Sequence, residues 1–216
     1  MYHHINRHIE PLLDRLRKKQ HVQDYDNLMH AFAQPDAPLD AEFQGRYARF
    51  WGFSQYVDKA WRENYFRQLW NSRNQAELGR RQLLERICHE TRSNRGGTER
   101  LQFSFATKLV HMVNPRSPIC DANVRAFYFL PDTNGGGAIE TRIRGCLEVY
   151  DALVKEYDRI LENRLLDESI ACFREELNPE TFTDIKVIDS LIWAFVTWAR
   201  QARQGPAFVK GELQYE

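Results

Sequence analysis

The 216-residue sequence predicts an all-α protein of eight to ten helices. Over most of the chain, apolar residues recur at intervals of three and four, which is the period of an amphipathic helix. The alternation of apolar and polar residues that indicates strands is almost absent. Glycine and proline number only 11 and 8 and are clustered, so long segments remain free for helices. We expect one domain over residues 1–216 in two lobes, one of N-terminal helices 1–91 with the C-terminal helix and one of central helices 98–178.

The first 91 residues contain several apolar stripes with helical spacing. The stripes cover residues 5–16, 25–32, 43–51, 57–70 and 78–87. Asp40 precedes the third stripe and predicts an N-cap there, because its carboxylate can accept hydrogen bonds from free amides of the first turn. Trp51, Trp61 and Trp70 lie on these stripes, and we interpret them as core residues rather than as a base-stacking wall.

Two breaks rich in glycine delimit the central helices. The first is 92–97, after which Thr98 predicts the cap of a helix over about 99–113. Asn114 to Pro118 ends that helix, and Asp121 begins a short one that reaches about Leu130. The second break is 131–137, and it precedes a long helix. The last helix follows Pro179 and is expected over about 180–202.

The net charge of zero excludes a protein that coats nucleic acid or anionic membrane through its overall charge. The charge is nevertheless uneven along the chain. Residues 80–125 contain nine Lys/Arg against four Asp/Glu, whereas residues 147–216 contain eight against fourteen. Two interpretations stay open: ordinary solvated helix faces, or a basic middle segment that faces phosphates.

Cysteine usage and apolar run lengths indicate a reduced cytoplasmic protein. The four cysteines are 26 to 32 residues apart and form no C-x-x-C pair, so we expect free thiols and no zinc site. The first thirty residues are charged throughout and resemble no signal peptide. The longest apolar run, Leu191 to Ala199, is far shorter than the roughly 20 residues that span a bilayer. We expect a monomer with no metal, no cofactor and no membrane partner.

Lys108 is unusual in its place on a predicted helix. Leu101, Phe105, Leu109 and Met112 share the apolar face of this helix, and Lys108 lies at the edge of that face. One interpretation is a lysine whose stem covers the core while its ammonium reaches water. The other is an amine nucleophile, because burial can lower a lysine pKa enough to leave a reactive neutral amine at neutral pH.

Two aspartates lie at positions where a carboxylate needs an explanation. Asp121 leaves a proline-rich turn and predicts an N-cap, which would keep it rigid and ionised. Asp189 falls between Ile185 and Trp193 on the apolar face of the last helix. A buried ion pair with a nearby arginine would account for it, and so would a ligand-binding role.

These residues resemble the helix-hairpin-helix DNA glycosylase superfamily, and within it the bifunctional 8-oxoguanine branch. The resemblance is in Phe105-Ala106-Thr107-Lys108 and in the proline-rich turn from which Asp121 opens a helix. It implies that Lys108 attacks C1′ of a damaged nucleotide, while Asp121 assists its deprotonation and stabilises positive charge on the sugar. Asp189-x-x-x-Trp193 is similar to the archaeal type of this enzyme, in which the aspartate accepts hydrogen bonds from the flipped purine and the tryptophan stacks on it.

The resemblance implies a DNA glycosylase with abasic-site lyase activity that excises an oxidised purine from double-stranded DNA through a lysine Schiff base. Basic side chains around these residues, namely Arg92, Arg95, Arg116 and Arg125, are candidates for phosphate contacts. Ser104 and Ala106 stand where the family has hairpin glycines. This substitution favours an alternative, a catalytically inactive DNA-binding module or subunit of a repair or defence assembly. An all-α interaction protein with no nucleic-acid role is a third hypothesis, which the zero net charge favours.

Overall fold

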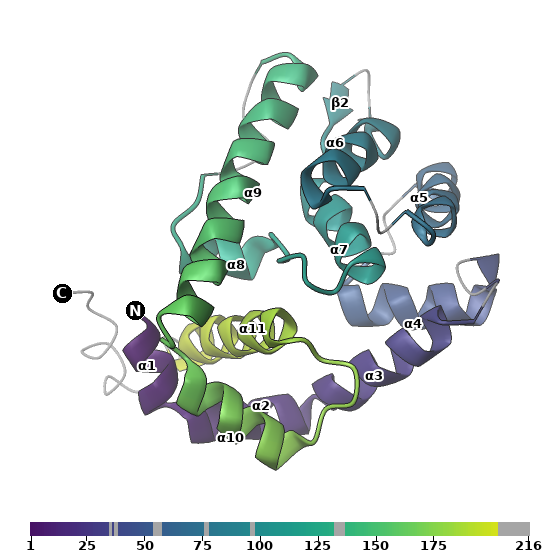
Figure 1. Ribbon diagram of the computed structural model, residues 1–216. Coiled ribbons are helices and arrows are strands. Elements are labelled where there is room, and N and C mark those ends of the chain that lie inside the picture. Colours follow the sequence, from purple (N-terminus) through teal and green to yellow (C-terminus); the bar gives the residue numbers. More distant parts are fainter. Residues whose placement is uncertain are drawn as a thin grey trace.

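The computed structural model describes residues 1–34, 36, 39–53, 58–75, 78–95, 98–131 and 137–202, without the side chains of 94, 95, 98 and 202. These residues form eleven helices and one short hairpin, which confirms the all-α class (Figure 1). The elements are α1 (Tyr2–Arg7), α2 (Ile9–Lys18), α3 (His21–Phe32), α4 (Ala41–Trp51), α5 (Lys59–Ser72), α6 (Arg80–Glu90), β1 (Ser93–Arg95), β2 (Thr98–Arg100), α7 (Phe103–Val113), α8 (Ala122–Phe127), α9 (Ile139–Glu162), α10 (Asp167–Leu177) and α11 (Asp184–Ala202).

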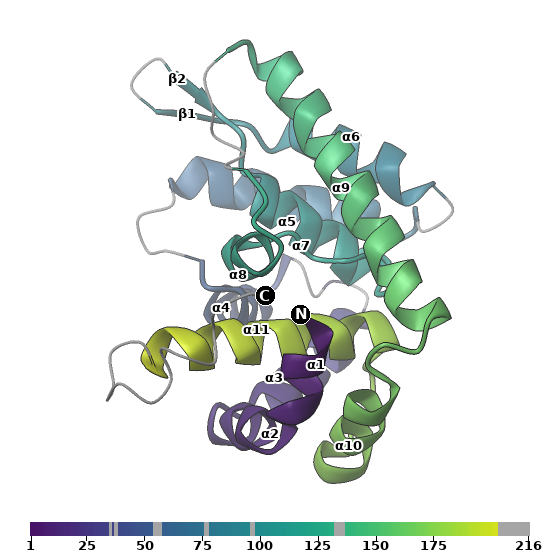
Figure 2. The same cartoon turned by 90° about the vertical axis from the view of Figure 1, so that its left-hand side faces the viewer.

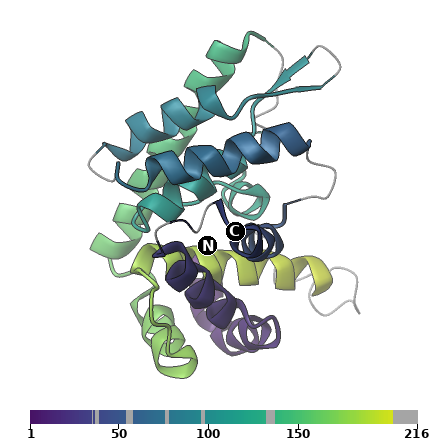
Figure 3. The same ribbon diagram turned by 90° about the vertical axis from the view of Figure 1, so that its right-hand side faces the viewer.

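Helix α11 lies in the middle of the structure (Figure 2). It packs against α8 on one side and against α2 and α10 on the other. Helices α5 and α6 pack on α7, and the long helix α9 packs on α6 (Figure 3). The C-terminal helix therefore contacts elements from both ends of the chain, whereas the division into two lobes stays a prediction.

Aspartate side chains cap the N-termini of α4 and α5. Asp40 accepts a hydrogen bond from the amide of Phe43 at 2.7 Å, which confirms the predicted N-cap of α4. Asp58 caps α5 in the same way through the amide of Trp61 at 3.0 Å. Helix α4 ends at Gly52, whose φ of +68° is a left-handed conformation that glycine adopts without a steric penalty. This end places the carbonyl group of Trp51 toward the core.

The core is rich in aromatic side chains, as their number in the sequence predicts. Trp51 and Trp61 are buried, and the hydroxyl groups of Tyr47 and Tyr65 lie 2.6 Å apart inside. Trp70, however, is 42% exposed, so its interpretation as a core residue is wrong. The buried face of α5 passes through Leu69, and the next residue is rotated by about 100° around the helix.

Two predicted helix starts are wrong. Residues 98–100 form β2, which pairs antiparallel with β1 through Asn94 and Glu99, so α7 begins only at Phe103. The strands are separated by two glycines in the sequence, a spacing typical of tight hairpins. Helix α11 begins at Asp184 rather than near 180, because Thr183 caps it: its Oγ1 accepts a hydrogen bond from the amide of Lys186 at 3.2 Å. The second predicted break lies largely outside the described residues, at 132–136.

All four cysteines are free thiols, and Cys172 is the one that is not fully buried. Within the described part of the chain, no helix combines the length and the apolar character needed to cross a membrane.

Candidate functional site

The amine of Lys108 is inside the protein. Its side chain is only 7% exposed, and Nζ donates a hydrogen bond to the carbonyl oxygen of Trp51 at 3.0 Å. The ring of Phe105 lies 5.0 Å from Nζ. The interpretation that the ammonium reaches water is therefore wrong, and a neutral amine can make the same hydrogen bond because it keeps two N–H groups.

Burial lowers the pKa of Lys108, because the charged form loses its hydration. Asp121 and Asp189 act against this effect, since each negative charge favours the protonated amine. The positive charge of Lys186 lowers the pKa further. Desolvation is the largest of these contributions, so Lys108 loses its proton more easily than a lysine in water.

Asp121 is the N-cap of α8, as predicted. Its Oδ1 accepts hydrogen bonds from the amides of Asn123 at 2.8 Å and Val124 at 3.0 Å. The turn before Asp121 is fixed to α7, because the amide of Cys120 donates to Oγ1 of Thr107 at 3.1 Å. Thr107 and Cys120 directly precede Lys108 and Asp121 in the chain. This one buried hydrogen bond therefore holds the two candidate catalytic residues on adjoining backbone segments.

Asp189 is buried in an ion pair, although its partner is not an arginine. Nζ of Lys186 lies 2.7 Å from its Oδ2, and these residues are 1% and 6% exposed. Burial raises the pKa of Asp189, whereas Lys186 lowers it. Lys186 was not among the residues predicted from the sequence. Its spacing of three residues from Asp189 was the available signal, because side chains at i and i+3 share a helix face.

Trp193 lies one turn beyond Asp189 on α11 and is half-buried. The ring of His21 stacks on it, with centroids 5.1 Å apart and planes at 17°. A ring nitrogen of His21 is 3.1 Å from Oγ of Ser190. Burial and the charge of Lys186 hold the pKa of His21 well below its ordinary value, so this ring is neutral at pH 7. The guanidinium of Arg15 also lies 6.0 Å from the indole centroid, so a base that stacks on Trp193 has to compete with His21 and Arg15.

A second histidine ties the aromatic core to the turn before Asp121. Nδ1 of His111 lies 2.8 Å from the carbonyl oxygen of Ser117, which can only accept, so Nδ1 carries the proton. Nε2 is then an acceptor and receives the hydroxyl proton of Tyr25 at 2.8 Å. Burial, with the charge of Lys186, lowers the pKa of His111 to about 3. This network fixes Tyr25 beside Lys186.

The structure describes the side chains of three of the four predicted phosphate contacts. Arg92 lies 3.5 Å from carboxylate oxygens of both Glu99 and Glu140, so its charge is already partly neutralised. Arg116 is exposed and Arg125 is half-buried. The side chain of Arg95 lies outside the described residues.

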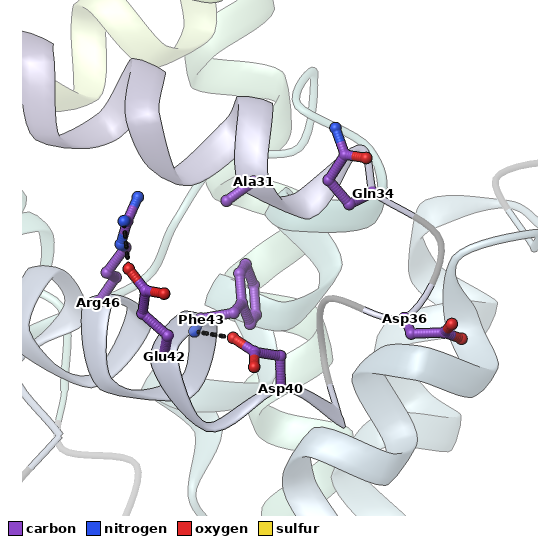
Figure 4. Close-up of a pocket in the computed structure, with 7 residues that line it drawn as sticks. All are labelled: Ala31, Gln34, Asp36, Asp40, Glu42, Phe43 and Arg46. Atoms are coloured by element: carbon purple, nitrogen blue, oxygen red, sulfur yellow. Dashed lines mark hydrogen bonds and ion pairs between the residues drawn. The ribbon is translucent and has the colours of Figure 1, made fainter.

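A surface pocket between the end of α3 and the start of α4 is separate from these residues (Figure 4). It is lined by Ala31, Gln34, Asp36, Asp40, Glu42, Phe43 and Arg46. Arg46 pairs with Glu42, and Asp40 caps α4, so these polar groups already have internal partners. In the described segments, no three His, Cys, Asp or Glu side chains are grouped so that they could hold a metal ion.

The strongest candidate site is therefore the junction of α4, α7, α8 and α11, where two lysines and two aspartates meet aromatic rings. Comparison with known proteins finds no matching family model, curated sequence or solved structure. The function of this junction has to be argued from its own residues.

Proposed function

We propose that this protein is a DNA glycosylase with abasic-site lyase activity, which excises an oxidised purine from double-stranded DNA through a Schiff base on Lys108. The observation that supports this proposal most strongly is the buried amine itself. Its pKa is lowered by desolvation while two carboxylates, Asp121 and Asp189, lie within electrostatic reach. A poised amine of this kind is what imine-forming enzymes use as a nucleophile.

The proposed reaction begins with the lone pair of Lys108 Nζ. The amine forms a bond to C1′ of the nucleotide, the bond from C1′ to the base breaks, and the base leaves with that electron pair and takes up a proton. Asp121 accepts the proton that the new secondary ammonium loses. Opening of the sugar ring then gives the imine, from which elimination of the 3′ phosphate and hydrolysis would follow. Asp121 suits this role because its N-cap hydrogen bonds keep the carboxylate in one orientation.

Asp189 and Trp193 are the proposed recognition residues for the flipped purine. The half-buried indole is the proposed ring for stacking, where the base would replace the ring of His21, and the carboxylate one turn earlier offers an acceptor for purine N–H groups. Since Lys186 binds Oδ2 of Asp189, the other carboxylate oxygen is the proposed acceptor. Basic residues of the segment 80–125 are the proposed phosphate contacts.

The test is borohydride trapping, in which reduction of the imine joins protein and DNA covalently. Duplexes with 8-oxoguanine or an abasic site are incubated with wild-type protein, with Lys108→Gln and with Lys155→Gln, which changes an exposed lysine of α9. We expect an adduct with the wild type and Lys155→Gln and none with Lys108→Gln. An adduct of equal yield with Lys108→Gln would refute the role of this amine.

One observation favours the second candidate, an inactive DNA-binding module. Lys108 is nearly inaccessible and already donates to Trp51, so DNA could bind without reaching the amine. This alternative predicts salt-sensitive DNA binding that survives Lys108→Gln, together with no base release and no adduct from any substrate.

A further inference from the structure

A second buried lysine, Lys186, has no place in the proposed reaction. It lies on α11, and its amine contacts rings from α3 and α4. Nζ is 5.0 Å from the ring centroids of Tyr25 and Trp51 and 5.6 Å from that of Phe50. With Asp189 at 2.7 Å, this arrangement supplies both an anion and the negative faces of aromatic rings, which together stabilise a cation.

Both lysine amines lie close to the ring of one residue, Trp51. Nζ of Lys186 is 5.0 Å from the Trp51 ring centroid, and Nζ of Lys108 is 5.9 Å from it. The nitrogens are therefore at most about 11 Å apart. At this distance two positive charges repel each other inside the protein, and the charge of Lys186 lowers the pKa of Lys108.

The partners of the two amines differ in charge. Lys186 is ion-paired with a buried carboxylate, whereas Lys108 donates its hydrogen bond to a neutral carbonyl group. The positive charge of Lys186 also lowers the pKa values of Lys108, His21 and His111. A single fixed cation therefore disfavours protonation of three neighbouring groups.

The other ionisable groups around Lys186 agree with this assignment. On α3 these are His21, Tyr25 and Asp26, and on α7 they are His111 and Lys108. The carboxylate of Asp26 is occupied by the amides of Glu180 and Thr181, and the hydroxyl of Tyr25 donates to His111. The direct counter-ion of Lys186 is Asp189.

We propose that Lys186 is a positioning residue: held by Asp189 and the rings of Tyr25 and Trp51, it is a permanent cation beside Lys108 and keeps the Lys108 amine free to act as a nucleophile. The role of the Lys108 amine as a nucleophile belongs to the proposed function, so this proposal rests on that function. Lys186 does not itself touch the substrate. In a lysine pair of this kind, the positive charge of one amine favours loss of the proton from the other.

The test measures protonation of both amines in the free protein, without DNA. Protein labelled with ¹³C-lysine is titrated by NMR, and the Cε signals of the two buried lysines are assigned from Lys108→Arg and Lys186→Arg. In the wild type we expect Lys108 to titrate below the ordinary pKa of a lysine amine, because its amine is buried and lies near the charge of Lys186. A Lys108 midpoint at or above the ordinary value would overturn the proposal.

Three variants then separate charge from packing. Lys186→Met is expected to raise the midpoint of Lys108 by about one pH unit or more, because the cation is gone and Asp189 remains. Lys186→Arg keeps the charge and is expected to restore the wild-type midpoint, and the exposed control Lys155→Met is expected to leave it unchanged. An unchanged midpoint in Lys186→Met would contradict the proposal.

The titration tests the role of Lys186, whereas the trapping experiment tests the proposed function, so one can fail without the other. If the midpoint of Lys108 rises in Lys186→Met but no lesion gives a borohydride adduct, the proposed function is wrong and the electrostatic role of Lys186 stands. If adducts form on Lys108 while its midpoint is unchanged in Lys186→Met, the function stands and the role of Lys186 is wrong.

Discussion

Acid should destabilise this protein through His111 in particular. The folded protein holds this ring neutral, with a pKa of about 3 against an ordinary value of 6.5. Between these pH values the unfolded chain binds more protons at this position than the folded chain does, so stability rises with pH and is lost as the pH falls. Each pH unit in this window is worth about 1.4 kcal/mol, so going from pH 7 to pH 4 should cost about 3 kcal/mol through this ring alone.

The measurement is urea unfolding, followed by tryptophan fluorescence at pH 7, 5 and 4. We compare the wild type with His111→Gln, which cannot titrate, and with the exposed control His3→Gln. The free energy of unfolding of His111→Gln should be lower at pH 7, because the buried hydrogen bonds to Tyr25 and Ser117 are disturbed, yet it should fall about 3 kcal/mol less on acidification. Parallel pH profiles for the wild type and His111→Gln would refute the assignment of a neutral buried ring.

Two further predictions concern the proposed active site. Asp121→Ala should lower the free energy of unfolding by about 1 kcal/mol through loss of the N-cap of α8, whereas Asp121→Asn should keep the cap and the stability. Both should abolish borohydride trapping, and full trapping by Asp121→Asn would show that the carboxylate is only a cap. Trp193→Ala should weaken binding of duplex with a damaged base by about 10- to 100-fold while trapping on a preformed abasic site continues. An equal loss on both substrates would contradict a role in base stacking.

Local features of the sequence predicted the helices and the two caps well. Helical periodicity located the apolar faces of α2 to α7, and Asp40 and Asp121 both cap the helices that follow them. These features depend on residues within about four positions of each other, and that range is what a pattern in the sequence reports. The same periodicity located Lys108 at the edge of an apolar face but left its burial and its partner open.

Features that depend on tertiary contacts could not be found in this way. The three-residue strands β1 and β2 are too short to show alternation, so their pairing gave no periodic signal. The segment before α11 is bound by Asp26, which accepts a hydrogen bond from the amide of Thr181 although it is over 150 residues away in the chain. The rings around Lys186 come from α3 and α4, so only folding brings Tyr25 and Phe50 to its amine.

Asp189 combines a feature that the local sequence predicts with one that it does not predict. Its burial was expected from the apolar face of α11, and an ion pair was one of the two interpretations given for it. The partner was expected to be a nearby arginine, yet it is Lys186 on the same helix. The spacing of three residues between Lys186 and Asp189 is visible in the sequence. It predicts an ion pair only if both side chains are buried, because exposed side chains can hydrogen-bond to water instead.

The most direct test of the central claim is to identify the residue that joins to DNA. Wild-type protein is trapped with borohydride on abasic duplex, digested with a protease, and the DNA-linked peptide is sequenced by mass spectrometry. We predict a reduced adduct on Nζ of Lys108. An adduct on the N-terminal amine, on Lys186 or on an exposed lysine would contradict the claim that the buried amine beside Asp121 captures C1′.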